Sequence, residues 1–175
     1  MRGRIIGKDF FERQTLIVAR ELLGKYLVRK VGGKTVALMI TETEAYDGFS
    51  DKASHASRGQ TPRNTPMFGE AGTIYVYFTY GRHWMLNIVC GKEKYPAAVL
   101  IRGAGEVEGP ARLTKALRID KRLNTKKLSK KDRLWIEDKG IRVSKKTIVA
   151  TPRIGIAYAG EWAKKPWRFV LLKHK

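Results

Sequence analysis

The sequence contains a single cysteine, Cys90, among its 175 residues, and this scarcity excludes several classes of protein. One cysteine cannot close an intrachain disulfide or supply the cysteine pairs of a structural zinc site. The histidine and two cysteines of a zinc nucleobase deaminase cannot be assembled either, and no other metal-site pattern is visible. Because Cys90 lies in an apolar run, we expect a buried, inert thiol in a protein of the reducing cytoplasm.

Long hydrophobic runs are also missing. Nowhere do about 18 apolar residues follow one another, the length that a membrane span needs. Charged residues interrupt the apolar positions of residues 1–25 every few residues. We therefore expect neither a signal peptide nor a membrane partner, and a cytoplasmic protein that is nucleoid-associated if its source is a prokaryote.

Acidic residues are scarce: 16 Asp and Glu stand against 36 Lys and Arg, a formal charge of +20. Such a field attracts polyanions, and nucleic acid comes first because phosphate contacts dominate nonspecific affinity. A basic membrane-surface protein would show a similar total. The excess is concentrated in residues 111–146, where 14 Lys and Arg accompany 4 Asp and Glu. This stretch is either a solvated face or a surface that contacts phosphates.

The residues that are present predict one packed domain with at least two helices. Hydrophobic residues make up 43% of the chain, whose length suits a single domain, and no repeat or linker divides it. Apolar residues at three-to-four spacing predict an amphipathic helix from Asp9 to about Leu23, with Asp9 as its cap and Gly24 as its stop. Pro110 occupies a favourable first-turn position of a second helix, residues 109–117.

Runs of β-branched and aromatic residues predict an antiparallel sheet. Gly32-Gly33 separates the two strands of one hairpin, and a turn near Tyr80-Gly81 separates those of another. Residues 47–72 form a loop longer than about 12 to 15 residues, a length that usually indicates function or disorder. The predicted strands are 25–31, 34–46, both arms of 73–91, 97–102, 153–160 and 165–172.

Glu42, Glu44 and Tyr46 lie at alternate positions of a predicted strand and therefore share one face. In an ordinary basic protein both glutamates would be solvated or paired with arginines. A carboxylate held among aromatic side chains could instead activate water near a sugar, where its charge would also favour a developing oxocarbenium ion.

Tyrosines accompany this acidic strand. Tyr75 and Tyr77 share a face of their own strand, and either could belong to a sheet core. Tyr80 lies at a hairpin tip, where a core aromatic would be out of place. Stacking on an aromatic side chain contributes roughly 1 to 3 kcal/mol per base, and a rigid side chain can wedge into a duplex, so Tyr80 indicates a nucleic-acid partner.

Eight fragments in one order resemble the alkyladenine (3-methyladenine) DNA glycosylase family of the mammalian type. Each fragment is weak alone, but all eight at near-equal spacing over nearly the whole chain argue against accidental similarity. The fragments are TETEAY, HASRGQTPRN, MF, GTIYVYFTYG, MLNI, VLIR, EGPARL and AGEWAKKPWRF.

The resemblance implies an α+β fold in which residues 1–175 form a single DNA glycosylase domain. This domain would be built on a curled antiparallel β-sheet, roll-like or open-barrel-like, with surrounding helices and a protruding DNA-intercalating hairpin. The enzyme would be monofunctional and monomeric, would need no metal or cofactor, and would act on double-stranded DNA containing damaged purines. It would flip out alkylated or deaminated purines of the 3-methyladenine, 7-methylguanine, hypoxanthine and ethenoadenine class and hydrolyse the N-glycosidic bond, leaving an abasic site.

Catalytic and base-binding roles carry over where the motifs match. Glu44 would be the general base that deprotonates the attacking water, and Arg102 would hold the target backbone or that water. Tyr46 would stack on one face of the flipped base, with His55 and Tyr77 on the other. The backbone amide of His55 would read the purine edge.

Further roles concern guanine rejection and the DNA. Asn87 would obstruct the exocyclic amine of guanine. Tyr80 would enter the gap left by the flipped nucleotide, and Arg63 and Arg82 would contact the DNA backbone. Arg82 replaces an apolar residue of the mammalian pattern, which makes the wedge more polar, and a loop one residue shorter puts the phosphate-binding role of Arg58 in doubt.

Two residues near these motifs are expected to lie outside the chemistry. Glu42 would be structural and would orient a neighbour, and His83 would be a surface residue. Two other functions stay open. One is a catalytically silent nucleic-acid-binding module, which would have no need of a buried Glu44. The other is a bifunctional glycosylase whose lyase step uses a lysine Schiff base.

Overall fold

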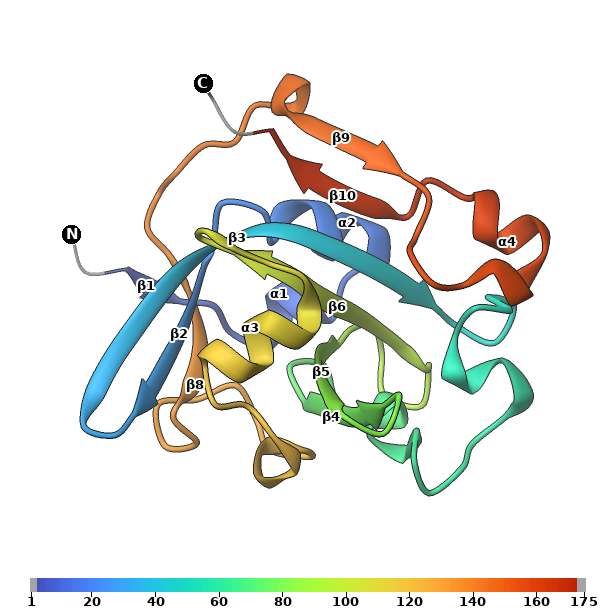
Figure 1. Ribbon diagram of the computed structural model, residues 1–175, viewed down its shortest axis with the longest axis horizontal. Coiled ribbons are helices and arrows are strands. Elements are labelled where there is room, and N and C mark those ends of the chain that lie inside the picture. Colours follow the sequence, from blue (N-terminus) through green and yellow to red (C-terminus); the bar gives the residue numbers. More distant parts are fainter. Residues whose placement is uncertain (1–2, 173–175) are drawn as a thin grey trace.

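Figure 1 shows the computed structural model, which describes residues 3–172 as a large antiparallel sheet with a few short helices. The strands are β1 (Arg4–Ile5), β2 (Tyr26–Val31), β3 (Lys34–Asp47), β4 (Ile74–Thr79), β5 (His83–Val89), β6 (Ala97–Ala104), β7 (Val107–Glu108), β8 (Leu134–Asp138), β9 (Ile148–Thr151) and β10 (Arg168–Leu171). Their main order is β1-β8-β2-β3-β6-β5-β4; β10 pairs with β3 and β9, and β7 pairs with β6. The sheet is open, and the fold is α+β.

The helices are short: α1 (Lys8–Phe11), α2 (Thr15–Glu21), α3 (Pro110–Ala116) and α4 (Glu161–Lys164). In Figure 1, α2 lies behind β3 and β6 and α3 lies in front of β5 and β6, and both helices contribute side chains to the main apolar core. Val18 of α2 and Leu22, which follows the helix, join Ile40 and Ile101 of the sheet in the main apolar core. Within residues 3–172, no helix has the length and apolar character that crossing a membrane requires.

Strand β3 connects all parts of the sheet. Its residues 34–39 pair with β2, residues 40–47 pair with β6, and residues 42–44 also pair with β10. The change of partner coincides with register shifts on either side of Glu42. Irregularities of this kind bend a strand and increase its local twist, and Figure 1 shows β3 running as a long strand across the molecule.

The predicted N-terminal helix is wrong in two respects. It consists of two helices, and Gly7 rather than Asp9 precedes the first of them. Arg13 Nε donates a 2.9 Å hydrogen bond to the Phe10 carbonyl, which satisfies a helix-end acceptor and ends α1. The backbone of Gln14 then becomes extended (φ −55°, ψ 132°) before α2 begins.

The strand predicted at residues 153–160 is also wrong. The strand of this region is β9, which ends before Pro152, and the segment that follows is a loop with a 3₁₀-turn at Ala157–Ala159. Gly155 (φ 76°) and Gly160 (φ 59°) adopt left-handed backbone conformations that break the extended course. The segment folds back against the long loop of residues 48–64 instead of joining the sheet.

The long loop predicted at residues 47–72 contains short helical turns. It contains 3₁₀-helices at His55–Arg58 and Thr65–Phe68. Ser54 Oγ accepts the Ala56 N–H at 3.3 Å at the start of the first of these, so the side chain of Ser54 caps the turn that carries His55.

Candidate active site

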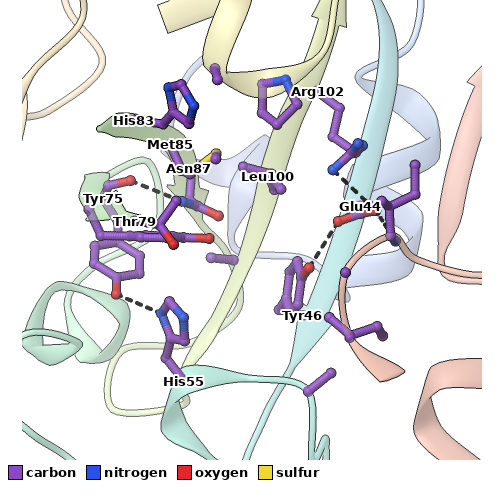
Figure 2. Close-up of a pocket in the computed structure, with 18 of the residues that line it drawn as sticks. Glu44, Tyr46, His55, Tyr75, Thr79, His83, Met85, Asn87, Leu100 and Arg102 are labelled. Atoms are coloured by element: carbon purple, nitrogen blue, oxygen red, sulfur yellow. Dashed lines mark hydrogen bonds and ion pairs between the residues drawn. The ribbon is translucent and has the colours of Figure 1, made fainter. Parts of the chain in front are cut away.

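A cavity of about 460 Å³ opens between one face of the sheet, the long loop and the segment after β9. Figure 2 shows Glu44, Tyr46 and Arg102 on one side of the cavity and Tyr75 and His55 on the other. All the residues predicted for catalysis and base binding line the cavity, together with the predicted intercalating residue and one of the two predicted backbone contacts. They are Glu44, Tyr46, His55, Arg63, Tyr77, Tyr80, Asn87 and Arg102.

The floor of the cavity is one row of residues across four strands. Tyr75 of β4 is the Cα partner of Asn87 of β5, which is the partner of Leu100 of β6, and Leu100 is the partner of Glu44 of β3. Because partners in register point to the same side of a sheet, these side chains face the cavity together. The alternate residues of these strands, among them Ile101, belong to the core on the opposite face.

Glu44 is fully buried, with a residue exposure of 0%. Its Oε2 accepts the Tyr46 hydroxyl at 2.9 Å and its Oε1 accepts the Ile154 N–H at 2.8 Å. Arg102 Nη1 lies 3.5 Å from Oε1. Burial raises the pKa of Glu44, and Arg102 and the two hydrogen bonds counteract part of this rise. The result is a carboxylate that is more basic than usual and is held in one orientation.

The register shifts of β3 and β6 explain how Arg102 reaches this carboxylate. Glu42 pairs with Gly103 and Thr43 pairs with Ile101, so Arg102 is an extra residue without a cross-strand partner. Its side chain points to the same face of the sheet as that of Leu100, two residues earlier. The guanidinium therefore lies between two glutamates: Nε donates to Glu42 Oε1 at 2.9 Å, and Nη1 approaches Glu44.

Tyr46 is backed by a buried ion pair. The Arg153 guanidinium carbon lies 4.7 Å from the centre of the Tyr46 ring. Arg153 pairs with Asp51 through both oxygens, at 2.6 and 2.8 Å, and both side chains are completely buried. Burial, and then the charge of Glu44, raise the pKa of Tyr46 well above its ordinary value, so the phenol remains a hydrogen-bond donor to that carboxylate.

The opposite wall consists of His55, Tyr75 and Tyr77. His55 Nδ1 lies 3.0 Å from the Tyr75 hydroxyl, and the ring centres of His55 and Tyr77 are 4.6 Å apart. Desolvation of its ring by these neighbours, and then the charge of Arg63, lower the pKa of His55 to about 4. Burial raises the pKa of Tyr77 to about 12. The wall is therefore uncharged at pH 7.

Asn87 is buried in the floor, and its Nδ2 donates to the Tyr75 carbonyl at 3.2 Å. Arg63, predicted as a backbone contact, donates to the Phe78 carbonyl at 3.0 Å and places its guanidinium carbon 5.2 Å from the centre of the Tyr77 ring. It therefore lies against the hairpin formed by β4 and β5 and also lines the cavity.

The tip of that hairpin presents Tyr80, whose exposed fraction is 75%. Tyr80 (φ 52°) and Gly81 (φ 65°) are both left-handed, and the Arg82 N–H donates to the Thr79 carbonyl at 3.2 Å, as in a type I′ turn. A tyrosine in this conformation costs about 1–2 kcal/mol relative to glycine. Arg82 is exposed at the same turn and does not line the cavity.

Several lining residues were not predicted. Ile154 supplies the N–H that contacts Glu44, and the exposed Tyr158 binds the Ala53 carbonyl at 3.1 Å near the mouth. His83, expected at the surface, is partly buried and lines the cavity. The buried partners Asp51 and Arg153 were also missed; AGEWAKKPWRF marked the neighbouring segment, but a single sequence contains no signal for that pairing.

Within residues 3–172, no group of three or more His, Cys, Asp or Glu side chains is arranged to hold a metal ion. The chemistry that these side chains can perform is proton transfer by a buried carboxylate, next to a space whose aromatic walls suit a flat ring.

A comparison with protein families identifies the class of protein to which this chain belongs. The family model described as methylpurine-DNA glycosylase (MPG) matches residues 9–108 and 104–175. The chain therefore belongs to the methylpurine-DNA glycosylase family, which supports the role of a DNA glycosylase in DNA repair.

Relatives from three organisms support the same assignment. A protein of Methanocella arvoryzae is 46% identical over 94% of this chain and 91% of its own length. One of Anaeromyxobacter dehalogenans strain 2CP-C is 44% identical over 93% of this chain and 81% of its own length. One of Legionella pneumophila strain Corby is 42% identical over 96% of this chain and 94% of its own length. All three are named "Putative 3-methyladenine DNA glycosylase".

Proposed function

We propose that this protein is a monofunctional glycosylase that removes alkylated or deaminated purines from duplex DNA by hydrolysis. The observation that carries the proposal is Glu44: a fully buried carboxylate with a raised pKa at the floor of an aromatic cavity, in a protein of charge +20. A module that only binds phosphates gains nothing from such a group, because burying a carboxylate is unfavourable and its charge repels the ligand.

The proposed reaction begins with extrusion of the damaged nucleotide. Tyr80, exposed at its turn, enters the gap and offsets part of the few kcal/mol that unstacking costs. Arg82 at the same turn and Arg63 beside the hairpin contact the DNA backbone. The strained backbone of Tyr80 supports this role, since a turn position that favours glycine keeps a large aromatic side chain there.

The extruded base is then bound between the walls. It stacks on Tyr46 on one side and on His55 and Tyr77 on the other, and the backbone amide of His55 reads its edge. Because His55 is neutral at pH 7, it accepts neutral and cationic purines without a charge penalty. Asn87, fixed by its bond to the Tyr75 carbonyl, obstructs the exocyclic amine of guanine.

Hydrolysis uses water and the carboxylate. The water oxygen attacks the anomeric carbon of the sugar, the bond to the purine nitrogen breaks, and its electron pair leaves with the base. Glu44 accepts the proton of the water, and its charge stabilises the oxocarbenium-like transition state. Arg102, beside Glu44, holds the water or the target backbone. The products are the free purine and an abasic site.

Single-turnover excision tests this proposal on duplexes that each carry one hypoxanthine, ethenoadenine or methylated purine, followed by alkaline cleavage of the product. We expect Glu44→Gln to keep lesion binding and to lose about 100-fold or more in rate, since general bases contribute on that order. Glu161→Gln is the matched control, because Glu161 is an exposed glutamate of α4 that pairs with the exposed Lys164 across one helical turn.

Three outcomes would contradict the proposal. Excision by Glu44→Gln at the wild-type rate would refute the role of Glu44 as the general base. Tight binding without excision of any lesion by the wild-type protein would establish a silent binding module. A covalent adduct trapped by borohydride would establish a lyase that acts through a lysine Schiff base.

A further inference from the structure

Glu42 holds two arginines next to the site. Its Oε1 accepts Arg102 Nε at 2.9 Å and Arg168 Nη1 at 2.8 Å. The exposed fractions of the three side chains are 15%, 11% and 23%, so solvent screens these contacts only in part. Arg102 lines the cavity, whereas Glu42 and Arg168 do not.

This geometry divides the guanidinium of Arg102 between two carboxylates. The short hydrogen bond from Nε goes to Glu42, and the longer contact of 3.5 Å from Nη1 goes to Glu44. An unpaired arginine beside a buried carboxylate would form its shortest bond with that carboxylate. Glu42 therefore prevents Arg102 from forming a close ion pair with Glu44.

Arg168 connects the carboxylate of Glu42 to a third strand, β10. It is the Cα partner of Glu44 across β10 and β3, yet its guanidinium bonds Glu42 and, through Nε, the Pro152 carbonyl at 3.1 Å. The charge of Glu42 is thus shared between an arginine of the cavity and one outside it.

The charges around Glu44 nearly cancel. Its surroundings contain two further carboxylates, three arginines, and aromatic or imidazole groups that are uncharged at pH 7. The carboxylates are Glu42 and Asp51, the arginines are Arg102, Arg153 and Arg168, and the uncharged groups are Tyr46, Tyr77 and His55. Removing one charge of the Glu42–Arg168 pair therefore changes the local balance by a full unit without touching a residue that lines the cavity.

We propose that Glu42 is a positioning residue, which holds Arg102 beside Glu44 without a close ion pair and, together with Arg168, keeps Glu44 reactive as the base. This role rests on the proposed function. It predicts opposite effects of two isolated substitutions, which loss of structure alone would not produce.

The directions follow from the charges. Glu42→Gln leaves Arg102 with Glu44 as its nearest anionic partner, which lowers the pKa of Glu44. In a profile of excision rate against pH, the acidic limb is the range in which the rate rises as Glu44 loses its proton. In Glu42→Gln this limb moves to lower pH, and the plateau rate falls because the base is weaker. Arg168→Gln leaves the charge of Glu42 less compensated, which raises the pKa of Glu44 and moves the limb to higher pH. We expect shifts of about 0.5 to 1 pH unit, since the network is partly screened.

The experiment measures single-turnover excision of one lesion from pH 5 to 9 for the wild-type protein, the two variants, Arg168→Lys and the double variant Glu42→Gln/Arg168→Gln. The same lesion throughout makes its own protonation cancel in the comparison. Arg168→Lys keeps the charge and should keep the wild-type limb. The double variant removes one charge of each sign and should return the limb toward the wild-type position. Thermal unfolding verifies that each variant is folded.

The outcomes separate this role from the proposed function. If Glu44→Gln is inactive and the limb moves in opposite directions in the two single variants, the role is supported. If Glu44→Gln is inactive and the limb stays in place or moves the same way in both, Glu42 is merely structural and the role is overturned. Excision by Glu44→Gln at the wild-type rate would overturn the proposed function, and this role with it.

Discussion

Replacing Asp51 by alanine should destabilise the protein more than the loss of any surface ion pair. Asp51 and Arg153 are both completely buried and bonded through two oxygens, and Asp51 also accepts the N–H groups of Asp47 and Ala53 at 3.1 Å each. The Asp51→Ala variant leaves the Arg153 charge buried without a counter-ion and deprives two backbone donors of their acceptor. Breaking a buried pair in this way costs about 3–5 kcal/mol.

This free energy translates into a large change in unfolding temperature. For a domain of this size each kcal/mol corresponds to about 2–4 °C, which predicts a decrease of roughly 6–20 °C for Asp51→Ala. The double variant Asp51→Leu/Arg153→Met should recover at least half of the loss, because apolar residues can replace a buried pair of similar volume. Excision should fall as well, since Arg153 lies against Tyr46 and precedes Ile154, which bonds Glu44.

Urea unfolding monitored by circular dichroism measures the free energies, and the slope against denaturant should remain unchanged. Glu161→Ala provides the control: its pair with Lys164 is exposed and should contribute less than about 1 kcal/mol. An Asp51→Ala variant that lost less than about 1 kcal/mol would refute the assignment of a structural ion pair at this position.

Three further predictions concern single side chains of the site. Tyr46→Phe removes a hydrogen bond that lowers the pKa of Glu44, so the acidic limb of the excision profile should move to higher pH. The plateau rate should nevertheless fall about tenfold, because Glu44 loses one of the bonds that hold it in one orientation; an unmoved limb would contradict this. Tyr80→Gly should raise stability by about 1 kcal/mol, because it relieves the left-handed backbone of a tyrosine. It should also weaken binding to lesion duplexes, because it removes the side chain that enters the duplex. Calorimetry measures the first effect and fluorescence anisotropy the second, and a less stable variant would argue against strain. His55, with its pKa lowered to about 4 from an unfolded value of 6.5, makes the folded state bind fewer protons between these values, so stability falls as pH decreases through that range. His55→Gln should make the melting temperature decrease less steeply over this pH range, and partial exposure of His55 to solvent makes the effect smaller. An unchanged slope of melting temperature against pH would contradict the lowered pKa of His55.

Much of the sheet and its hairpins could be predicted because their signals are local. Gly32-Gly33 and Tyr80-Gly81 stand where the chain reverses, and alternation alone placed Glu42, Glu44 and Tyr46 on one face. The break in the N-terminal helix could not be predicted, because the bonds from Arg13 to the Phe10 carbonyl and from Thr15 to Asp47 depend on geometry that periodicity does not contain.

The candidate site shows the same division. The motifs identified Glu44, Tyr77 and Asn87, and the register of the strands brings these residues into one cavity. The pairing of Arg153 with Asp51 joins residues 102 positions apart, and RIGIAYAG has the alternation of a strand although it is a loop. A charged residue in such a pattern is expected at the surface, and only the folded chain shows that its side chain has an exposed fraction of 0%.

The pairing of β10 with β3 at Glu44 determines when during synthesis the site can exist. Arg168, the partner of Glu44 in the sheet, is translated long after Glu44. The basic stretch of residues 111–146 emerges before β10, so an incomplete chain already carries most of the charge that attracts DNA. The sheet around the carboxylate is completed only after residue 171 is free, and truncated products should therefore associate with DNA without cutting bases from it.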